Sequence, residues 1–399
     1  MVFVSSLTPP PPPKTTLLEN LQAQPHRIFF FAGIVQGLVY ALVLALNYLG
    51  VLSLSVGVGH YHAYAFTFNV FTQFFAGFLL TTFPRYLARP TVSKTLYMPI
   101  IWLINGGSFL FLALSLFSQT WVILGMAVGL VGYVKLCFLL LDLQTKSTVT
   151  NKTDTSWMLR AFAMGLVGYG LFIANLFLPL STLAIMVSFY LYLLMIVLIV
   201  SQKMIPFFTA NAIAGYTVSK SRYFLHVILF FLILKIVLEY LNINALAANG
   251  GLFLTVTYEL IKWRLPFKKA PAILSVLFLS LWWMPISFGL FSLHDISMLL
   301  EKPIYMEKAA LHALALGYFT TILIGFGTRI ILGHAGRTPK ADGYATLLFG
   351  LIQVMTLMRL FAGIFPEFGY LHAILTVATL WIIIFGMWSK RYIHILFEK

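Results

Sequence analysis

The sequence contains few charged residues and almost no cysteine. Only 9% of its 399 residues are Asp, Glu, Lys or Arg, against roughly 25% in soluble globular domains. The single cysteine, Cys137, lies in an apolar run, which excludes a disulfide framework or a thiolate metal site and favours a packing role. We also expect no cleavable signal peptide, because the first apolar run begins only after Arg27.

The apolar residues that replace these groups form long, continuous runs. Hydrophobic residues make up 60% of the chain, aromatic residues 16%, and the mean hydropathy is +0.94. Uninterrupted runs of about 20 residues are typical of membrane-spanning helices, whereas a membrane β-barrel shows ~10-residue alternating segments. The sequence therefore predicts an all-α polytopic transmembrane bundle.

About twelve spans are predicted. In chain order they are 28–48, 60–83, 96–117, 121–141, 157–178, 182–204, 223–241, 244–262, 271–292, 305–332, 344–364 and 368–388. The weakest is 244–262, since Asn249, Gly250, Gly251 and Glu259 could break it, and 305–332 is longer than one bilayer crossing needs.

The net charge of +15 does not indicate a nucleic-acid partner, because Lys and Arg cluster in alternate connections between the runs. That alternation favours the lipid bilayer as partner and, by the positive-inside rule, places both termini in the cytoplasm. Only the region around Lys302 and Lys308 departs from it. We predict a disordered Pro-rich cytoplasmic tail (1–26), a twelve-span domain (27–390) and a cytoplasmic tail (391–399).

This topology sorts the nine histidines into two depths. The outer group is His60, His62, His294, His312 and His372, and the inner group is His26, His226, His334 and His394. His312 and His334 are 22 residues apart, which is ~33 Å along a helix. They therefore cannot share one site.

His62, His312 and His372 could converge in the outer half of the membrane as axial haem or copper ligands. His60 and His62 point ~200° apart on a helix, so only one of them can face a given ligand there. His62 shares its helix face with Phe66, Asn69 and Gln73. A purely interfacial or hydrogen-bonding role is the alternative for each histidine, and it suits His294 and His394 best.

Other ionisable residues also fall inside spans. Lys235 and Glu239 are four residues apart and can neutralise each other. Arg359 lies in the outer half, with Gln353 and Thr356 at helical spacing. It can balance either a haem propionate or a protein carboxylate.

Several stretches resemble the NnrS family of bacterial membrane proteins. They are Arg27-Ile-Phe-Phe, Ala76-Gly-Phe-Leu-Leu-Thr-Thr-Phe-Pro84, Ile205-Pro-Phe-Phe-Thr209, His312-Ala-Leu-Ala-Leu-Gly317, Thr328-Arg329 and Gly333-His334-Ala-Gly-Arg337. One stretch departs from the family pattern of H-x-H followed by an acid, since His60-Tyr-His62-Ala-Tyr64 has no acid. Either His60 and His62 are that pair, or His62 and Tyr64 occupy its places.

The resemblance implies a haem- and copper-containing protein of the bacterial inner membrane that confers tolerance to nitric oxide by binding or reducing it. With no Cys-x-x-Cys-His motif in the sequence, the haem is expected to be non-covalent, of b type. For haem we expect His62, His312, His372 and Arg359. For metal we expect His60, His62, His312 and His334. A second site would draw on His26, His226, His334, Arg329 and Arg337.

The electron donor and the reaction, if the protein is an enzyme, are not identified by the sequence. The alternative function is a membrane transporter of haem, metal or a small anion, which twelve spans suit equally well. No clear inverted repeat is evident, which disfavours a transporter.

Overall fold

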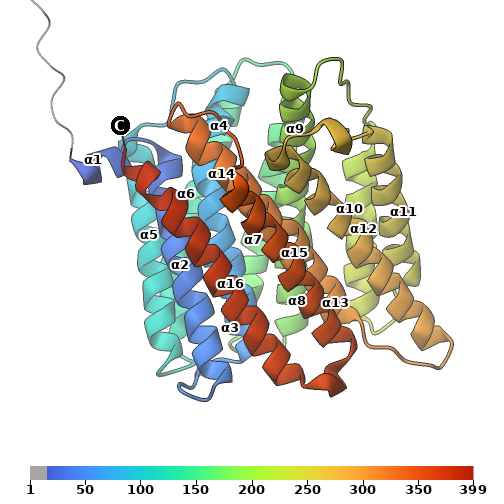
Figure 1. Ribbon diagram of the computed structural model, residues 1–399. Helices are drawn as coiled ribbons and strands as arrows, with labels where there is room; N and C mark the ends of the chain where they lie inside the picture. Colours follow the sequence, from blue (N-terminus) through green and yellow to red (C-terminus); the bar gives the residue numbers. More distant parts are fainter. Residues whose placement is uncertain (1–15, 399) are drawn as a thin grey trace, which may run out of the picture.

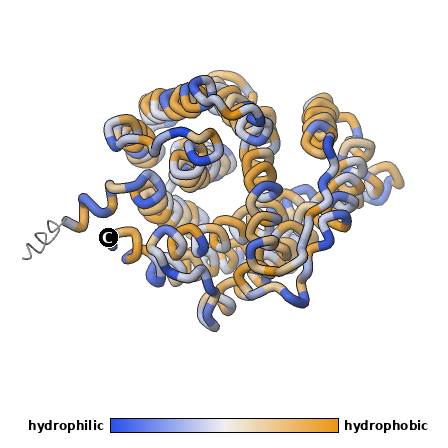
Figure 2. Tube along the Cα trace, turned by 90° about the horizontal axis from the view of Figure 1, so that it is seen from above, coloured by the Kyte–Doolittle hydropathy of each residue, from blue (hydrophilic) through white to orange (hydrophobic). Residues whose placement is uncertain are grey.

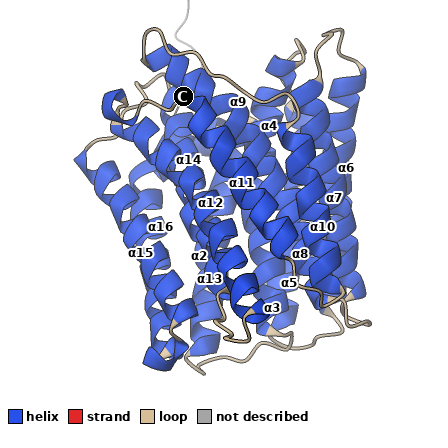
Figure 3. Cartoon of the chain, turned by 90° about the vertical axis from the view of Figure 1, so that its right-hand side faces the viewer, coloured by secondary structure: helices blue, strands red, loops and turns tan. Residues whose placement is uncertain are grey.

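The chain folds into long helices that run antiparallel between two ends of one bundle (Figure 1). A computed structural model describes residues 16–398, which contain helices and short connections and no strand (Figure 3). The all-α prediction is therefore confirmed. Ten helices are long and apolar enough to cross a membrane, and hydrophobic residues predominate on the peripheral helices (Figure 2).

The helices form three successive units, each built from four long helices. The first unit comprises α2 (Pro25–Tyr48), a continuous helix made of α3 (Val58–Tyr64), η1 (Ala65–Phe71) and α4 (Thr72–Tyr86), then α5 (Lys94–Ser115) and α6 (Val122–Thr145). The second comprises α7 (Thr153–Ala174), a continuous helix of α8 (Ser181–Met186), η2 (Val187–Leu194) and α9 (Met195–Ala212), then α10 (Phe224–Tyr240) and α11 (Leu246–Trp263).

The third unit follows the same plan after the short helix η3 (Phe267–Lys269). It comprises α12 (Ala272–Leu299), a continuous helix of α13 (Glu307–His312), η4 (Ala313–Thr320) and α14 (Thr321–His334), then α15 (Gly343–Ile364), η5 (Pro366–Phe368) and α16 (Tyr370–Tyr392), which continues into η6 (Ile393–Phe397). In each unit the first helix packs on the second and the third packs on the fourth. The last helix of each unit packs on the first of the next, and α16 closes the ring on α2.

We call the end of the bundle that carries the chain termini the inner end and the opposite end the outer end, as the sequence predicts. The second helix of every unit has a π-helical segment in its outer half, namely η1, η2 and η4. These three helices are the most buried of the ten candidate spans. Their π segments meet at the centre, where the Phe319 ring lies 6.0 Å from Phe71 and 5.2 Å from Phe189. π-helical segments are rare in proteins, and those that occur are often found at functional sites. The centre of the bundle is therefore a candidate location for a functional site.

The predicted spans correspond to these helices. The over-long span 305–332 is the α13–η4–α14 helix, and the doubtful span 244–262 forms α11. α10 and α11 are shorter or less apolar than the ten, so a count of twelve membrane crossings stays a prediction. Both ends of the described chain lie at the same end of the bundle (Figure 1), which is what an even count requires, and the Lys- and Arg-rich connections lie there too.

The predicted disordered N-terminal tail (1–26) includes residues that are helical in the structure. Residues 1–15 lie outside the described residues, but residues 17–21 form α1 (Leu17–Leu21), whose first turn is closed by a capping box between Thr16 and Glu19. Asn20 donates to the Phe397 carbonyl at 3.0 Å, so α1 is joined to the C-terminal segment. In the predicted C-terminal tail, Ile395 and Leu396 of η6 are buried.

Candidate functional site

The structure brings His62 and His312 together in the outer half of the bundle, at the junction of the first and third units. His62 lies in α3, three residues before η1, and His312 is the last residue of α13, directly before η4. Their rings are nearly parallel, at 7°, with centroids 6.3 Å apart. That separation is larger than a face-to-face stacking contact.

At this separation both imidazoles could contribute to holding one bound group, and imidazole nitrogen is a common ligand of haem iron and copper.

The two histidines are held differently. His312 Nδ1 donates to the Lys308 carbonyl at 2.7 Å, which leaves Nε2 as the unprotonated nitrogen, the usual arrangement for a metal-binding histidine. His62 packs on Phe66 with centroids 4.9 Å apart, and its buried Nδ1 has no hydrogen-bond partner among the described residues. A hydrogen bond thus orients the His312 ring, whereas the Nδ1 of His62 has no such bond.

One further polar group near this pair has unused hydrogen-bonding capacity. Arg359 of α15 is 5% exposed, its guanidinium lies 5.8 Å from the Tyr370 ring centroid, and its buried Nη1 has no partner among the described residues. Since buried polar groups in native structures are almost always hydrogen-bonded, this donor fits a site that receives an anionic group. Gln73, further along the helix that carries His62, is also fully buried with both amide atoms unpaired.

The other outer histidines face elsewhere. His60 is contacted by Asn175, whose Nδ2 lies 2.9 Å from Nδ1, and packs on Phe172 of α7. It therefore faces the second unit, as the helical spacing requires. His372 is exposed at the start of α16. His294 is held by the Ile304 carbonyl at 2.9 Å and by Glu307 at 3.3 Å.

The predicted inner group is brought together only in part. His26 and His334 are in contact, with ring centroids 4.3 Å apart, and His26 is buried beside Thr81. His226 instead packs on Trp157 and Tyr223, and Arg329 lies over the Phe208 ring. Arg337 pairs with Glu398 at 2.6 Å. Across residues 16–398, no group of three or more His, Cys, Asp and Glu side chains could hold a metal ion.

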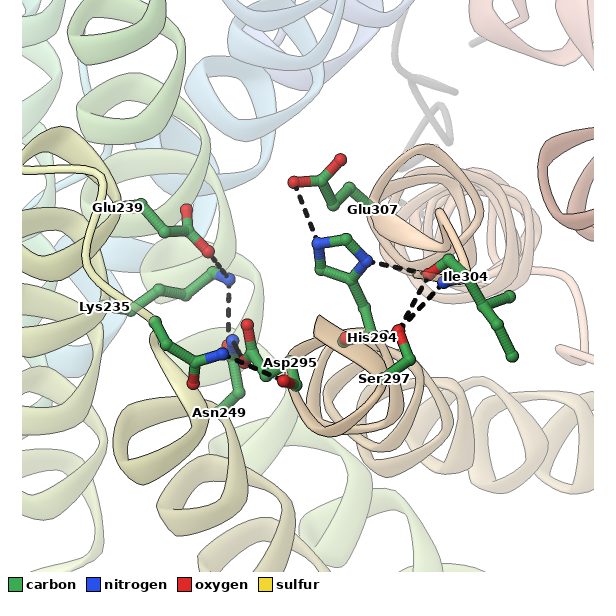
Figure 4. A network of polar contacts seen from close by, with 9 residues as sticks. Lys235, Glu239, Asn249, His294, Asp295, Ser297, Ile304 and Glu307 are labelled. Atoms are coloured by element: carbon green, nitrogen blue, oxygen red, sulfur yellow. Dashed lines mark hydrogen bonds and ion pairs between the residues drawn. The ribbon is translucent and has the colours of Figure 1, made fainter. Parts of the chain in front are cut away.

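A second buried polar cluster lies at the junction of the second and third units. The sequence predicts only its Lys235–Glu239 pair. Lys235 is fully buried and bonds both Glu239, as predicted, and Asn249 Oδ1 at 2.8 Å. Asn249 donates to Asp295 at 2.6 Å, and the Lys235 ammonium lies 3.5 Å from the Phe291 ring centroid. Figure 4 shows the resulting chain of contacts across α10, α11 and α12. The sequence singles out Asn249 only as a residue that could break its span. A buried amide near a buried ammonium can nevertheless indicate a polar cluster.

The junction between the first and second units has its own polar set. His60 meets Asn175 there, and the hydroxyls of Tyr64 and Tyr169 share a hydrogen bond at 2.5 Å. The three junctions at the outer end therefore hold different chemistry. Of these junctions, the one between the first and third units presents two near-parallel imidazoles.

Fold and site together define a multi-pass helical membrane protein with a half-buried pair of near-parallel histidines. A protein-family model described as NnrS protein matches residues 20–399. The chain therefore belongs to the NnrS family. A search of curated proteins finds no match.

Proposed function

We propose that the chain is an NnrS-type haem protein of the bacterial inner membrane that acts in tolerance to nitric oxide, by binding or reducing it. The observation that carries the proposal is the pair of near-parallel imidazoles of His62 and His312, 6.3 Å apart. Family membership and the implications of the family resemblance support it further.

In this proposal His62 and His312 hold a non-covalent b-type haem between them, in the outer half of the membrane. A bound haem iron supplies reversible binding of nitric oxide and one-electron chemistry. His312 keeps its ring oriented through the hydrogen bond to Lys308, whereas His62 has no such support. We expect His312 to be the firmer ligand.

Arg359 supplies the positive charge for a haem propionate. The sequence left a protein carboxylate as the alternative partner. No Asp or Glu pairs with Arg359 in the described part of the chain, and its buried Nη1 is unpaired. An arginine with free donors suits a carboxylate ligand.

Copper belongs to the proposal through the family resemblance. The predicted metal residues His60, His62, His312 and His334 are divided among three places in the bundle. Copper is therefore proposed at the His26–His334 pair, separate from the haem at His62 and His312.

The test is the visible spectrum of the purified protein. We expect a Soret band that shifts when nitric oxide is added and is lost in His312→Ala. His62→Ala should keep part of the haem but shift the band, because one of the two residues that would hold the haem is removed. His372→Ala is the matched control, since His372 is exposed, and should leave the band unchanged. A colourless, metal-free protein that is still active in cells would refute the proposal and favour a transporter.

A further inference from the structure

A long pocket opens between α2 and α5 on the lipid-facing side of the first unit. Its volume is ≈ 400 Å³, within the usual range for small-molecule sites. Along α2 it extends from Ile28 to Tyr40 and along α5 from Ile101 to Leu112, and Leu18 and Leu21 of α1 line its inner end. Trp102 and Phe109 flank it, 66% and 74% exposed.

The pocket exists because α5 is packed on α6 rather than on α2. Gly107 of α5 faces Gly125 and Gly129 of α6 so closely that an added Cβ at Gly107 would lie 2.3 Å from the Gly129 nitrogen. Small residues let membrane helices approach this closely. The two helices therefore pair tightly, and α2 and α5 stay apart along their lipid-facing edges.

The pocket is lined mainly by apolar surface, and a few polar side chains, among them Gln36 and Asn105, lie at its floor. Gln36 donates to Asn105 Oδ1 at 2.5 Å, and the buried Gln36 Oε1 has no partner among the described residues. Further out, the Tyr40 hydroxyl is held by Ser108 at 2.7 Å and by Asn69 at 2.8 Å. A polar group in hydrocarbon is costly without a partner, so the unpaired acceptor at Gln36 indicates a ligand that donates a hydrogen bond.

The depth of this floor restricts the ligand. Gln36 is eleven residues from the start of α2, and Asn105 is eleven residues from the start of α5 (36 − 25 and 105 − 94). Both lie ~16 Å along helices that begin at the same end of the bundle, which is near the middle of a ~30 Å hydrocarbon layer. A phospholipid headgroup is charged and stays at the interface, whereas a neutral hydroxylated ring on an isoprenoid chain can reach this depth.

We propose that this pocket binds a lipid-soluble hydroquinone, with a ring hydroxyl donating to Gln36 Oε1 and the isoprenoid chain along the groove between α2 and α5. Trp102 and Phe109 offer aromatic surfaces to the ring. The ring would lie beside Tyr40, which packs on Tyr61 with centroids 5.6 Å apart, and Tyr61 directly precedes His62. The role of the hydroquinone as electron donor rests on the proposed function, whereas its binding in the pocket does not.

The first experiment measures quinone that copurifies with the full chain. Protein purified in mild detergent from quinone-containing membranes is extracted with organic solvent, and quinone is quantified per protein. We expect near-stoichiometric quinone in the unmodified chain. The double variant Gln36→Leu/Asn105→Leu removes the polar floor, and Ala32→Phe fills the groove at another lining residue. Each should lower the quinone content about tenfold, since a hydrogen bond or its space is lost.

The control is Thr257→Val on α11, outside the pocket, whose hydroxyl donates to the Phe253 carbonyl. It removes a polar group from a membrane helix and should keep the quinone. Thermal unfolding of every variant checks that it is folded. Phospholipid but no quinone in the extract, or quinone retained in both pocket variants, would overturn the proposal.

The second experiment uses a benzohydroquinone with a decyl tail as the probe. Its titration into the detergent-solubilised chain should quench a part of the tryptophan fluorescence that is absent in Trp102→Phe. Quenching of equal size in Trp102→Phe would count against this pocket. The visible spectrum of the same samples separates the two proposals. Quinone without haem would refute the haem proposal and leave this one, and haem without quinone would do the reverse.

Discussion

The rings of His26 and His334 lie in contact at the inner end of the bundle, with centroids 4.3 Å apart and planes inclined by 33°. They come from the first turn of α2 and the last turn of α14. This pair joins the first and third units at the inner end, as His62 and His312 do in the outer half. The two pairs are separated by most of the length of the α13–α14 helix, so they can be tested independently.

His334→Ala should leave the Soret band of the outer pair unchanged and lower the copper content of the purified protein. The reason is the depth difference, since His334 is 22 residues beyond His312 on one continuous helix. Absorbance and elemental analysis of the same sample provide the two measurements. Loss of the haem band in His334→Ala would contradict the separation into two sites.

Arg359→Met should weaken haem retention about tenfold, because it removes the positive charge proposed to balance a propionate while keeping the length of the side chain. Transfer of haem to an apo-globin acceptor measures the retention. Lys308→Met is the matched control, since it removes an exposed cation from the outer end of the same region. Equal retention in Arg359→Met and the unmodified chain would limit Arg359 to packing against Tyr370.

Lys235→Met should be strongly destabilising, by about 3–5 kcal/mol, because it leaves buried Asp295 and half-buried Glu239 without their cation. The triple change Lys235→Met/Glu239→Gln/Asp295→Asn removes all three charges and should recover much of the loss. The measurement is thermal unfolding in detergent. If the triple variant is no more stable than Lys235→Met alone, the destabilisation comes from lost packing against Phe291 rather than from uncompensated charge.

Gly107→Ala should lower the melting temperature by several degrees, because the new Cβ would meet the Gly129 backbone at 2.3 Å. Gly106→Ala is a matched control on the same helix, since a Cβ there has no atom within 4 Å. It should be neutral or stabilising by up to about 1 kcal/mol, the helix-propensity difference. A melting temperature for Gly107→Ala equal to that of Gly106→Ala would show that α5 and α6 can separate without cost.

Asp342 should contribute stability that disappears in acid. It is the N-cap of α15, and the Ala345 N–H at 2.9 Å, together with Arg391 at 2.7 Å, holds the pKa of its carboxyl below the usual range. A lowered folded-state pKa stabilises the folded protein above the unfolded pKa of about 3.9, and this contribution is lost as the pH falls through the folded value.

Asp342→Ala should therefore cost about 1 kcal/mol at neutral pH, the usual value of an N-cap. The difference from the unmodified chain should shrink below about pH 4. Melting temperatures measured at several pH values provide the check. Asp342→Asn, which can still cap the helix, should lose less. A difference that does not change with pH would mean that capping alone, and not the charge, stabilises this end of α15.

The sequence by itself determined the helices and their approximate extent. Hydrocarbon thickness fixes how many apolar residues a span needs, so runs such as 344–364 match α15 almost residue for residue. Local spacing also determined what lies on one helix face. Lys235 meets Glu239 because four residues make about one turn, and His60 faces away from His62 for the same reason.

Only the tertiary structure decided which helices meet, because association of membrane helices depends on side-chain packing between segments whose hydropathy is nearly the same. It joined His62 to His312 and His26 to His334, and it left His372 exposed. It completed the Lys235 cluster with Asn249 and Asp295 from two other helices. The pocket beside Gln36 depends on close packing of α5 against α6, a contact between helices that the spacing of residues along one helix does not fix.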